Sequence, residues 1–320
     1  MSDILLPEIP QITEVEIELT NHCNANCVAC PRDQLSVEKG YMTESVFCSI
    51  IQKYSDYRKQ LSINKLLSTD KFPALAYAGM GETLLHKNIF DYIRHGADNK
   101  FFSVLFTNAS LLDQEKAYKL CESGINQVYI SFWGINEEEY RNSMGLEYKN
   151  TLKNVEFFSR LAKKMNIPTV IIWVENKYIT STKQEIERFW QERNIAVDTE
   201  NAPWNRGGYL SQNNILNFKG YPAIDFDKDI WCSQLYFTDT IAWNGDVIIC
   251  SCDYYKKQNL IGNINTCLPE QIALRKKKIL DSKQNILLCK NCKKPDRNYY
   301  FGSEPWDNIL DHGQKSKYWY

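Results

Sequence analysis

The chain lacks a long apolar run, a basic amino-terminal segment and an excess of charge of either sign. No apolar stretch approaches the roughly 18 residues that span a bilayer, and the opening Met-Ser-Asp-Ile-Leu-Leu-Pro-Glu-Ile-Pro contains no basic residue. Lys and Arg number 38 against 39 Asp and Glu, a net charge of −1, so no global field attracts nucleic acid or an anionic membrane. These absences predict a cytoplasmic protein that binds neither nucleic acid nor a membrane.

The length and one local run of charge refine this picture. The run from Arg275 to Lys278 is basic, and a short run of like charge is interpreted as a solvated helix face. At 320 residues the chain exceeds the roughly 250–300 residues at which a single hydrophobic core stops growing. We therefore expect one large domain and a smaller one.

Cysteine carries the most information in this chain. With 11 cysteines and no export signal, metal ligation or catalysis is favoured over disulfide bonding, because cytosolic thiols stay reduced. Cys23, Cys27 and Cys30 stand in the run Cys-Asn-Ala-Asn-Cys-Val-Ala-Cys on one short loop. Three thiolates on a four-iron cluster leave one iron open for chemistry. A zinc loop is the alternative interpretation, although zinc prefers a closed site with four ligands.

Strand-like and helix-like segments alternate from Glu14 to about Leu210. Such alternation implies a parallel sheet covered by helices, here an α/β fold with a partial (β/α)6 TIM-like barrel whose active site lies at the carboxyl ends of the strands. The predicted strands are Glu14 to Leu19, Ala74 to Ala78, Phe101 to Thr107, Gln127 to Phe132, Thr169 to Val174 and Val197 to Asn201. The predicted helices include Phe47 to Tyr54, Ile89 to Ala97, Leu112 to Cys121, Leu152 to Met165 and Lys183 to Arg193.

Polar residues follow the predicted strands at the edge where such barrels bind ligands. After the second strand, Gly79 and Gly81 permit close backbone approach or a positive φ, and Glu82 offers an acceptor. An ordinary strand-to-helix turn is the alternative there. The polar residues at the ends of the third, fourth and fifth strands are Asn108, Ser131 and Glu175.

A second group of cysteines belongs to a predicted β-hairpin. Two β-rich runs, the first beginning at Trp231, flank Asn244-Gly245, which is a strong turn signal. The hairpin and a later loop would bring four thiols together, and such a group would suit an iron–sulfur cluster or a zinc ribbon. Cys252, next to Asp253, is either a redox-active thiol or a hairpin residue without a role. The four thiols are Cys232, Cys250, Cys289 and Cys292.

The first cysteine motif and its surroundings resemble the radical S-adenosylmethionine (SAM) superfamily. The resemblance implies a 4Fe-4S cluster on Cys23, Cys27 and Cys30, with SAM chelated by the open iron and cleaved to a 5'-deoxyadenosyl radical. A Gly-Gly-Glu type motif holds the SAM amino group in that family, and residues 79–82 stand at its place, with Met80 for the second glycine.

The resemblance assigns SAM contacts to several residues of the chain. It implies that Gly79, Gly81 and Glu82 bind the amino group and that Asn108 makes a polar contact. Ala109 stands where the family usually has glycine. Two further matches imply a contact of Ser131 with the SAM carboxylate or ribose and of Glu175 with the ribose.

The carboxyl-terminal cysteines resemble the SPASM and twitch extensions of that superfamily. Because no cysteine follows Cys292, the shorter twitch form is implied, with one auxiliary 4Fe-4S cluster on the four thiols and thus two clusters per chain. In an epimerase Cys252 would return a hydrogen atom to substrate, with Asp253 orienting that thiol; in an oxidation, which together with fragmentation is favoured over epimerisation, Asp253 would accept the proton that the radical loses. The expected domains are a radical SAM core (1–215), a twitch domain (216–300) and a tail (301–320).

The resemblance predicts an enzyme that takes a hydrogen atom from its substrate. We expect modification of a ribosomally made precursor peptide, with an aminocyclitol or sugar dehydrogenase or epimerase as the alternative, and an iron–sulfur scaffold or electron-transfer protein as a non-enzymatic one. Only 22 residues precede Cys23, so recognition of a leader peptide would need a separate binding protein or the aromatic-rich segments near Tyr299 to Phe301 and Tyr318 to Tyr320. A flavodoxin- or ferredoxin-type protein is the expected electron donor.

Overall fold

Parallel strands form the part of the sheet that carries the predicted site. The computed structural model describes residues 9–32, 37–63, 73–199, 206–210, 232–253 and 260–281, together with 286, 288, 289 and 292. Strands β1 to β6 lie side by side in sequence order, each parallel to the next. Their bounds are β1 Glu14–Ile17, β2 Ala74–Tyr77, β3 Ser103–Thr107, β4 Gln127–Ser131, β5 Thr169–Ile172 and β6 Ala196–Asp198.

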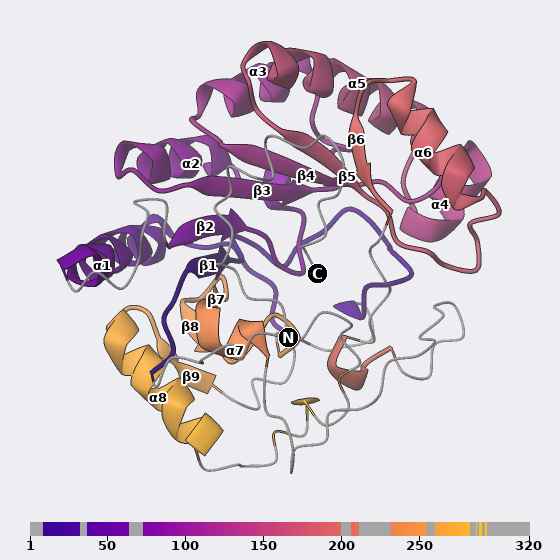
Figure 1. Cartoon of the computed structure of the whole chain (residues 1–320). Coiled ribbons are helices and arrows are strands. Elements are labelled where there is room, and N and C mark those ends of the chain that lie inside the picture. Colours follow the sequence, from indigo (N-terminus) through magenta and orange to yellow (C-terminus); the bar gives the residue numbers. More distant parts are fainter. Residues whose placement is uncertain are drawn as a thin grey trace, which may run out of the picture.

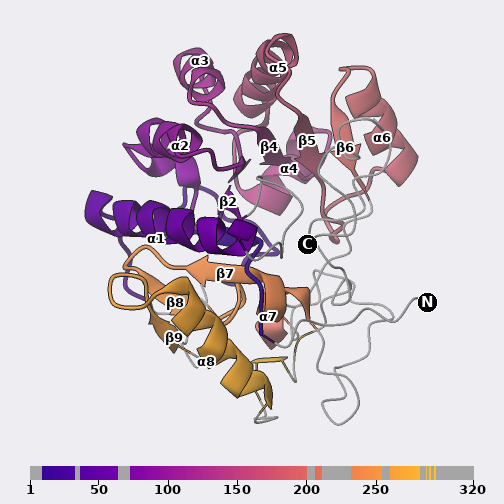
Figure 2. The ribbon, with the colours of Figure 1, turned by 60° about the vertical axis from the view of Figure 1, so that its left-hand side comes forward.

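Helices cover the outer face of this sheet, as the two views in Figure 1 and Figure 2 show. The arrangement confirms the predicted α/β fold with a sheet dominated by parallel strands, as in a partial barrel. Helix α4 was not predicted. The helices of this part are α1 Glu44–Ile63, α2 Ile89–Asp98, α3 Gln114–Glu122, α4 Glu137–Met144, α5 Tyr148–Lys164 and α6 Lys183–Gln191, and Thr83–Leu85 forms the short 3-10 helix η2.

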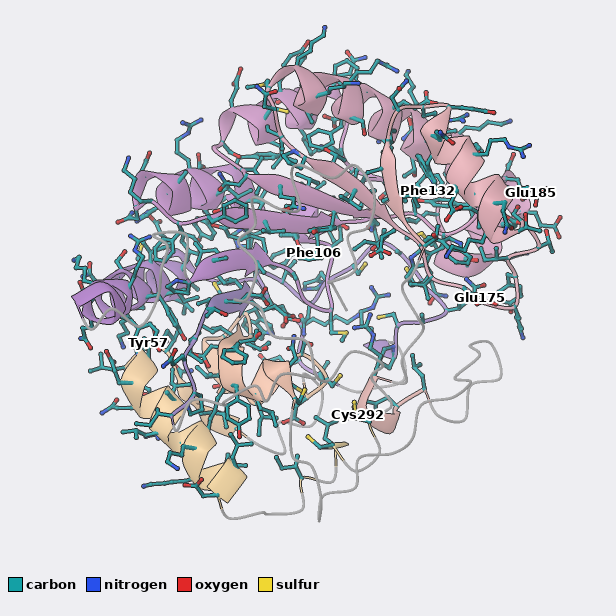
Figure 3. All side chains as sticks on the ribbon, in the orientation of Figure 1. Tyr57, Phe106, Phe132, Glu175, Glu185 and Cys292 are labelled. Carbon is teal, nitrogen blue, oxygen red and sulfur yellow. The ribbon has the colours of Figure 1, made fainter. Side chains whose placement is uncertain are left out.

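Alternation along the strands divides the core into two layers. In β4, Val128 and Ile130 belong to the large cluster beneath the helices, whereas Tyr129 faces the other way and joins a smaller cluster with Val104. Successive strand residues point to opposite faces, which produces this division. The ring of Phe106 stacks on Tyr129 with 5.0 Å between centroids, and Figure 3 shows Phe106 on the side of the sheet away from α3 and α5.

The carboxyl-terminal hairpin continues the same sheet. Strand β7 (Thr238–Ile241) pairs in parallel with β1, and β8 (Asp246–Ile248) and β9 (Leu260–Asn263) follow in antiparallel order. Gly245 has φ +85° between β7 and β8, which confirms the predicted turn. The expectation of a β-run from Trp231 was wrong for Ser233–Phe237, which forms the short helix α7.

The basic run from Arg275 to Lys278 lies in helix α8 (Pro269–Asp281) but is not simply a solvated face. Lys276 is 1% exposed, and its Nζ lies 2.6 Å from Oδ1 of the fully buried Asp239 in β7. Tyr54 of α1 donates a hydrogen bond to the other carboxylate oxygen at 2.5 Å. The interpretation as a solvated face is therefore wrong for Lys276, because a buried acid next to β1 supplies its partner.

Two features of the predicted organisation are not tested by the coordinates. The predicted boundary between residues 215 and 216 and the tail 301–320 lie outside the described residues, so the division into domains stays a prediction. Within the described ranges, no helix combines the length and the apolar character needed to cross a membrane.

Candidate radical SAM site

The loop after β1 brings the first three cysteines together. Cys23, Cys27 and Cys30 are all partly exposed, and the backbone N–H of Cys30 donates to the carbonyl of Cys27 at 3.0 Å in a tight turn. Burial raises the pKa of the Cys27 thiol well above its ordinary value, and the neighbouring thiols of Cys30 and Cys23 raise it further. The three sulfurs therefore lie within electrostatic reach of one another.

Hydrogen bonds from helix α4 fix the shape of this loop. The backbone N–H of Asn26 donates to the carbonyl of Met144 at 2.9 Å, and that of Val28 donates to the carbonyl of Ser143 at 3.0 Å. Within the loop, the Arg32 guanidinium donates to the carbonyl of Ala25 at 2.7 Å. Paired backbone groups hold a loop in one conformation, so the thiols are presented on a braced support.

The chemistry of these donors fits an iron–sulfur cluster. Among the residues that the structure describes, no three His, Cys, Asp or Glu side chains are arranged to hold a single metal ion. In a multi-iron cluster each thiolate binds a different iron, and clusters of this kind are held by cysteine thiolates. Three neighbouring, partly exposed thiols on one loop match that requirement.

The loop after β2 packs directly against the chain that leads to Cys23. The backbone N–H of Glu82 donates to the carbonyl of His22 at 2.8 Å. A Cβ on Gly81 would lie 2.1 Å from the carbonyl oxygen of Thr20, and Gly79 has φ +138°. Glycine is needed at both positions: Gly81 because of its close approach to the chain that leads to Cys23, and Gly79 because of its backbone angle and its contact with Glu18.

The Glu82 carboxylate connects the loops after β2 and β3. Its Oε1 accepts from the Thr107 hydroxyl at 2.6 Å and the backbone N–H of Leu84 at 3.1 Å, and its Oε2 accepts from the backbone N–H of Asn108 at 2.8 Å. The side chain is buried, and burial raises the pKa of Glu82 although these bonds act in the opposite direction. With about four lone-pair sites on a carboxylate, Oε2 keeps room for one further donor.

Asn108 braces the cysteine loop from the side of β3. Its Nδ2 donates to Oδ1 of Asn24 at 3.0 Å, and its Oδ1 accepts from the backbone N–H and hydroxyl of Ser110 at 2.9 and 2.6 Å. Asn24 lies between Cys23 and Cys27. The side-chain amide of Asn108, which the sequence predicted to contact SAM, therefore connects the loop after β3 to the cysteine loop.

The other two predicted contacts differ in their surroundings. Ser131 is partly exposed at the end of β4, whereas Glu175 is exposed on the loop after β5, where Figure 3 marks it. Its neighbour Asn176 is buried and accepts a hydrogen bond from the Ser143 hydroxyl at 3.1 Å. Asn176 thus supports the end of α4 that braces the cysteine loop, a role that no sequence signal indicated.

A second group of thiols lies at the end of β8. The Cys250 thiol, through a hydrogen bond, raises the pKa of the buried Cys252 well above its ordinary value, and burial and the thiol of Cys292 add to this effect. Figure 3 shows Cys292 on the side of the sheet away from α3 and α5. Cys289 is buried, and Cys232 is partly buried beside α7. The structure therefore brings Cys250, Cys252 and Cys292 together.

Asp253 and a glycine turn complete the surroundings of this thiol group. The backbone N–H of Asp253 donates to the carbonyl of Cys250 at 2.9 Å, and the carboxyl side chain is fully buried. Gly207, with φ +69°, approaches so closely that its Cβ would lie 3.3 Å from the Cβ of Cys252. The turn around Gly207 therefore packs onto the thiol group.

A small apolar cluster connects the two thiol groups, and its tyrosine was missed by the sequence reasoning. Met80 of the β2 loop packs with Ile248 of β8, and the partly buried Cys30, Val37 and Tyr209 pack against them. Residues 206–210 carry only a Gly-Gly turn signal in the sequence, which does not indicate where the following tyrosine lies.

The chain has relatives among characterised proteins. It is 31% identical over 167 residues to the AdoMet-dependent heme synthase of Methanosarcina barkeri, a match that covers 52% of this chain and 44% of that protein. The chain spans less than half of the length of the first curated relatives that it matches.

Solved structures and a family model extend this comparison. BtrN in complex with AdoMet and 2-DOIA superposes with a TM-score of 0.60 at 17% identity, over 90% of this chain and 96% of that one. Streptococcus suis SuiB bound to the precursor peptide SuiA gives 0.56 at 16% identity, over 83% and 65%. At these identities the likeness concerns the fold alone. Because the family model of the radical SAM superfamily matches residues 17–178, about half of the sequence, the chain belongs to the radical SAM superfamily.

Proposed function

We propose that this chain is a radical SAM enzyme whose first cluster is held by Cys23, Cys27 and Cys30. The observation that carries the proposal is the group of three partly exposed thiols on a braced loop, directly against the glycine-rich loop after β2. When bound, the cluster and SAM supply a 5'-deoxyadenosyl radical, and the protein supplies orientation and excludes water.

The residues around the cysteine loop are assigned to SAM. Gly79 and Gly81 allow the β2 loop to approach the cysteines, and Glu82 offers its remaining acceptor position to the SAM ammonium group. Ser131, at the end of β4, donates to the carboxylate or ribose, and Glu175 accepts from the ribose. Asn108 acts on SAM mainly through the shape of the loop that it braces.

The carboxyl-terminal thiols are assigned to a twitch-type auxiliary 4Fe-4S cluster. Cys250, Cys289 and Cys292 lie in two short turns, each closed by a backbone hydrogen bond, and Cys232 stands at the start of α7. Thiolate is the ligand that such clusters require. The proposed cluster would lie at the end of a hairpin that extends the barrel sheet from β1, and this position supports a role in electron transfer with the substrate.

The proposed substrate is a ribosomally made peptide, which an oxidation or a fragmentation would modify. Support comes from SuiB, which shares the fold and whose solved structure holds a precursor peptide. A small aminocyclitol is the second candidate, because the likeness to BtrN covers almost the whole of that chain, solved with AdoMet and 2-DOIA. A flavodoxin- or ferredoxin-type protein would supply electrons, and a separate protein would present a leader peptide.

One experiment tests the proposal. Anaerobically reconstituted protein is incubated with SAM and dithionite, and 5'-deoxyadenosine is quantified with and without candidate peptides and aminosugars in deuterated water. We expect 5'-deoxyadenosine from the wild type, none from the triple Ala variant of Cys23, Cys27 and Cys30, and a mass change in one substrate class. A protein that binds iron but forms no 5'-deoxyadenosine would be a scaffold or an electron-transfer protein.

A further inference from the structure

Tyr209 lies between the two thiol groups and has no role in the assignments above. On one side it packs against the small cluster of Met80, the residue between the two glycines of the β2 loop, and Ile248, against which Cys30 also packs. The side chain is only partly buried, so its neighbours do not enclose it. A phenol at this place is next to the loop assigned to SAM.

The turn that precedes Tyr209 packs against the carboxyl-terminal thiol group. Burial raises the pKa of Tyr209 to about 12, and the charges of Asp253, Cys252 and Cys250 contribute in that order. The preceding residues, Gly207 and Gly208, both have positive φ, and the turn packs against Cys252. Glycine adopts these angles without a steric cost, so the two glycines form the turn that determines where the tyrosine is presented.

Cys252, the donor that the sequence suggested, is less accessible. It is 3% exposed, it is hydrogen-bonded to the thiol of Cys250, and the backbone of Gly207 covers its Cβ. A hydrogen donor must reach the reacting carbon, and this thiol is enclosed on several sides. Tyr209, which is partly exposed, is the more accessible of the two residues.

We infer that Tyr209 donates its phenolic hydrogen atom to the carbon radical formed between the β2 loop and the carboxyl-terminal thiols. This inference rests on the radical-forming step of the proposed function, and it applies to the fragmentation, whose product radical must gain a hydrogen atom, and not to the oxidation, in which the radical loses an electron instead. The inference adds a catalytic residue to the proposed enzyme and assigns the role of hydrogen donor to Tyr209 instead of Cys252.

The step balances in atoms and electrons. A C–H bond forms as the O–H bond of Tyr209 breaks, and the tyrosine is left as a neutral phenoxyl radical. The exchange is favourable because a phenolic O–H bond is weaker than an aliphatic C–H bond. One electron from a reduced flavodoxin- or ferredoxin-type protein, or from dithionite in an assay, and one proton from water then restore the phenol.

The test needs no identified substrate, because SAM cleavage without substrate leaves the 5'-deoxyadenosyl carbon to take hydrogen from a nearby group. Reconstituted enzyme in deuterated water, with SAM and dithionite alone, is expected to form 5'-deoxyadenosine that carries one deuterium, since the phenolic hydrogen exchanges with water. Tyr209→Phe, which keeps the ring, should still form 5'-deoxyadenosine but lose this deuterium. Mass spectrometry of the nucleoside measures both quantities.

Two control variants accompany this change. Tyr41→Phe removes the hydroxyl of an exposed tyrosine that stacks on His22 beside the cysteine motif, with 4.7 Å between centroids, and should keep the deuterium. Cys252→Ala should keep it as well. If Tyr209→Phe fails to retain iron, Tyr209→Leu, which preserves an apolar contact with Met80, takes its place.

The outcomes separate this inference from the function on which it rests. Wild-type protein that forms no 5'-deoxyadenosine would contradict the proposed function itself. Ample 5'-deoxyadenosine without deuterium in the wild type, or with undiminished deuterium in Tyr209→Phe, would overturn the inference and leave the function standing. Loss of deuterium in Cys252→Ala alone would assign the donor role to the thiol.

Discussion

The two thiol groups of this chain differ in how the protein holds them. Around Cys23, Cys27 and Cys30, polar contacts from three directions brace the loop: α4, the loop after β2 and the loop after β3. In the carboxyl-terminal group Cys250 and Cys292 are also partly exposed, whereas Cys252 is buried beneath the close backbone of Gly207. The first group is held by hydrogen bonds from neighbouring loops, and the second lies at an end of the sheet that depends on packing.

This difference matches the two roles assigned to the groups. A site that must admit SAM needs open positions beside its ligands, and its loop must then be held by polar contacts rather than by burial. A cluster that only exchanges electrons tolerates enclosure. The carboxyl-terminal group depends on the attachment of β7 and α8 to β1 and α1, which includes a buried ion pair.

Breaking that ion pair should have the largest effect on stability. In Lys276→Met the carboxylate of Asp239 loses its partner while buried, which should lower the free energy of unfolding by about 3–5 kcal/mol. Lys277→Met is the matched control on the same helix, since the ion pair of Lys277 with Asp281 is partly exposed, and such pairs contribute about 0–1 kcal/mol. Urea denaturation of reconstituted protein measures the free energy of unfolding of both variants. Equal losses in the two would contradict the role of the buried ion pair in attaching α8 to the sheet.

Removing the Glu82 carboxylate should affect the first site selectively. Glu82→Ala loses a charge-assisted hydrogen bond to the SAM ammonium, about 1.5–3 kcal/mol, so SAM affinity should fall about tenfold or more while iron content is retained. Glu139→Ala is the control, because Glu139 is also buried and accepts hydrogen bonds from Thr180 and Ser181 away from this site. Isothermal titration with SAM compares the SAM affinities of the two variants. Unchanged affinity in Glu82→Ala would show that Glu82 only connects the loops after β2 and β3 and does not bind SAM.

The same carboxylate should make SAM binding depend on pH. Because burial raises the pKa of Glu82 above 4.5, its contribution to folding is largest below that value and declines as pH rises through the raised pKa. The ammonium of SAM needs the ionised form, so SAM affinity should change in the opposite sense and increase over the same interval. Glu82→Gln should remove this dependence, and a titration curve that Glu82→Gln leaves unaltered would assign it to another group.

The smallest change concerns the backbone next to Asn108. Ala109 is buried with φ 55°, a left-handed conformation that costs an L-residue about 1–2 kcal/mol, whereas glycine adds about 0.4–1 kcal/mol of unfolded-state entropy. Ala109→Gly should therefore stabilise the protein slightly, by about 0–1.6 kcal/mol by the same two estimates. The control Ala117→Gly, in helix α3, should destabilise it. Equal losses in thermal melts would show that the strain at Ala109 is not relieved.

The parallel strands were predicted to within a few residues of their ends because their signal is local. The run from Val15 to Ile17 alternates apolar and polar residues, and the run from Val128 to Ile130 is a short, β-rich apolar stretch; both signals are visible in a short window. Helix α4 escaped prediction because its sequence, EEEYRNSM, lacks an apolar periodicity. It begins instead at the cap of Asn136, whose side chain accepts from the backbone N–H of Glu139.

Residues whose roles depend on distant partners could not be predicted in this way. Lys276 is buried because it forms an ion pair with Asp239, which lies 37 residues earlier in the chain. Tyr209 was missed because its position between Met80 and the second thiol group follows from the fold alone. In contrast, the three cysteines and Glu82 were found because their spacing and order along the chain reflect the chemistry directly.

The iron content of matched cysteine variants tests the two-site account most directly. Wild-type protein reconstituted without oxygen should hold about eight irons per chain, the sum of two four-iron clusters. Changing Cys23, Cys27 and Cys30 together to Ala should remove about half of the iron and all 5'-deoxyadenosine formation, whereas changing Cys250 and Cys292 should remove the other half. About four irons per wild-type chain together with bound zinc would contradict it.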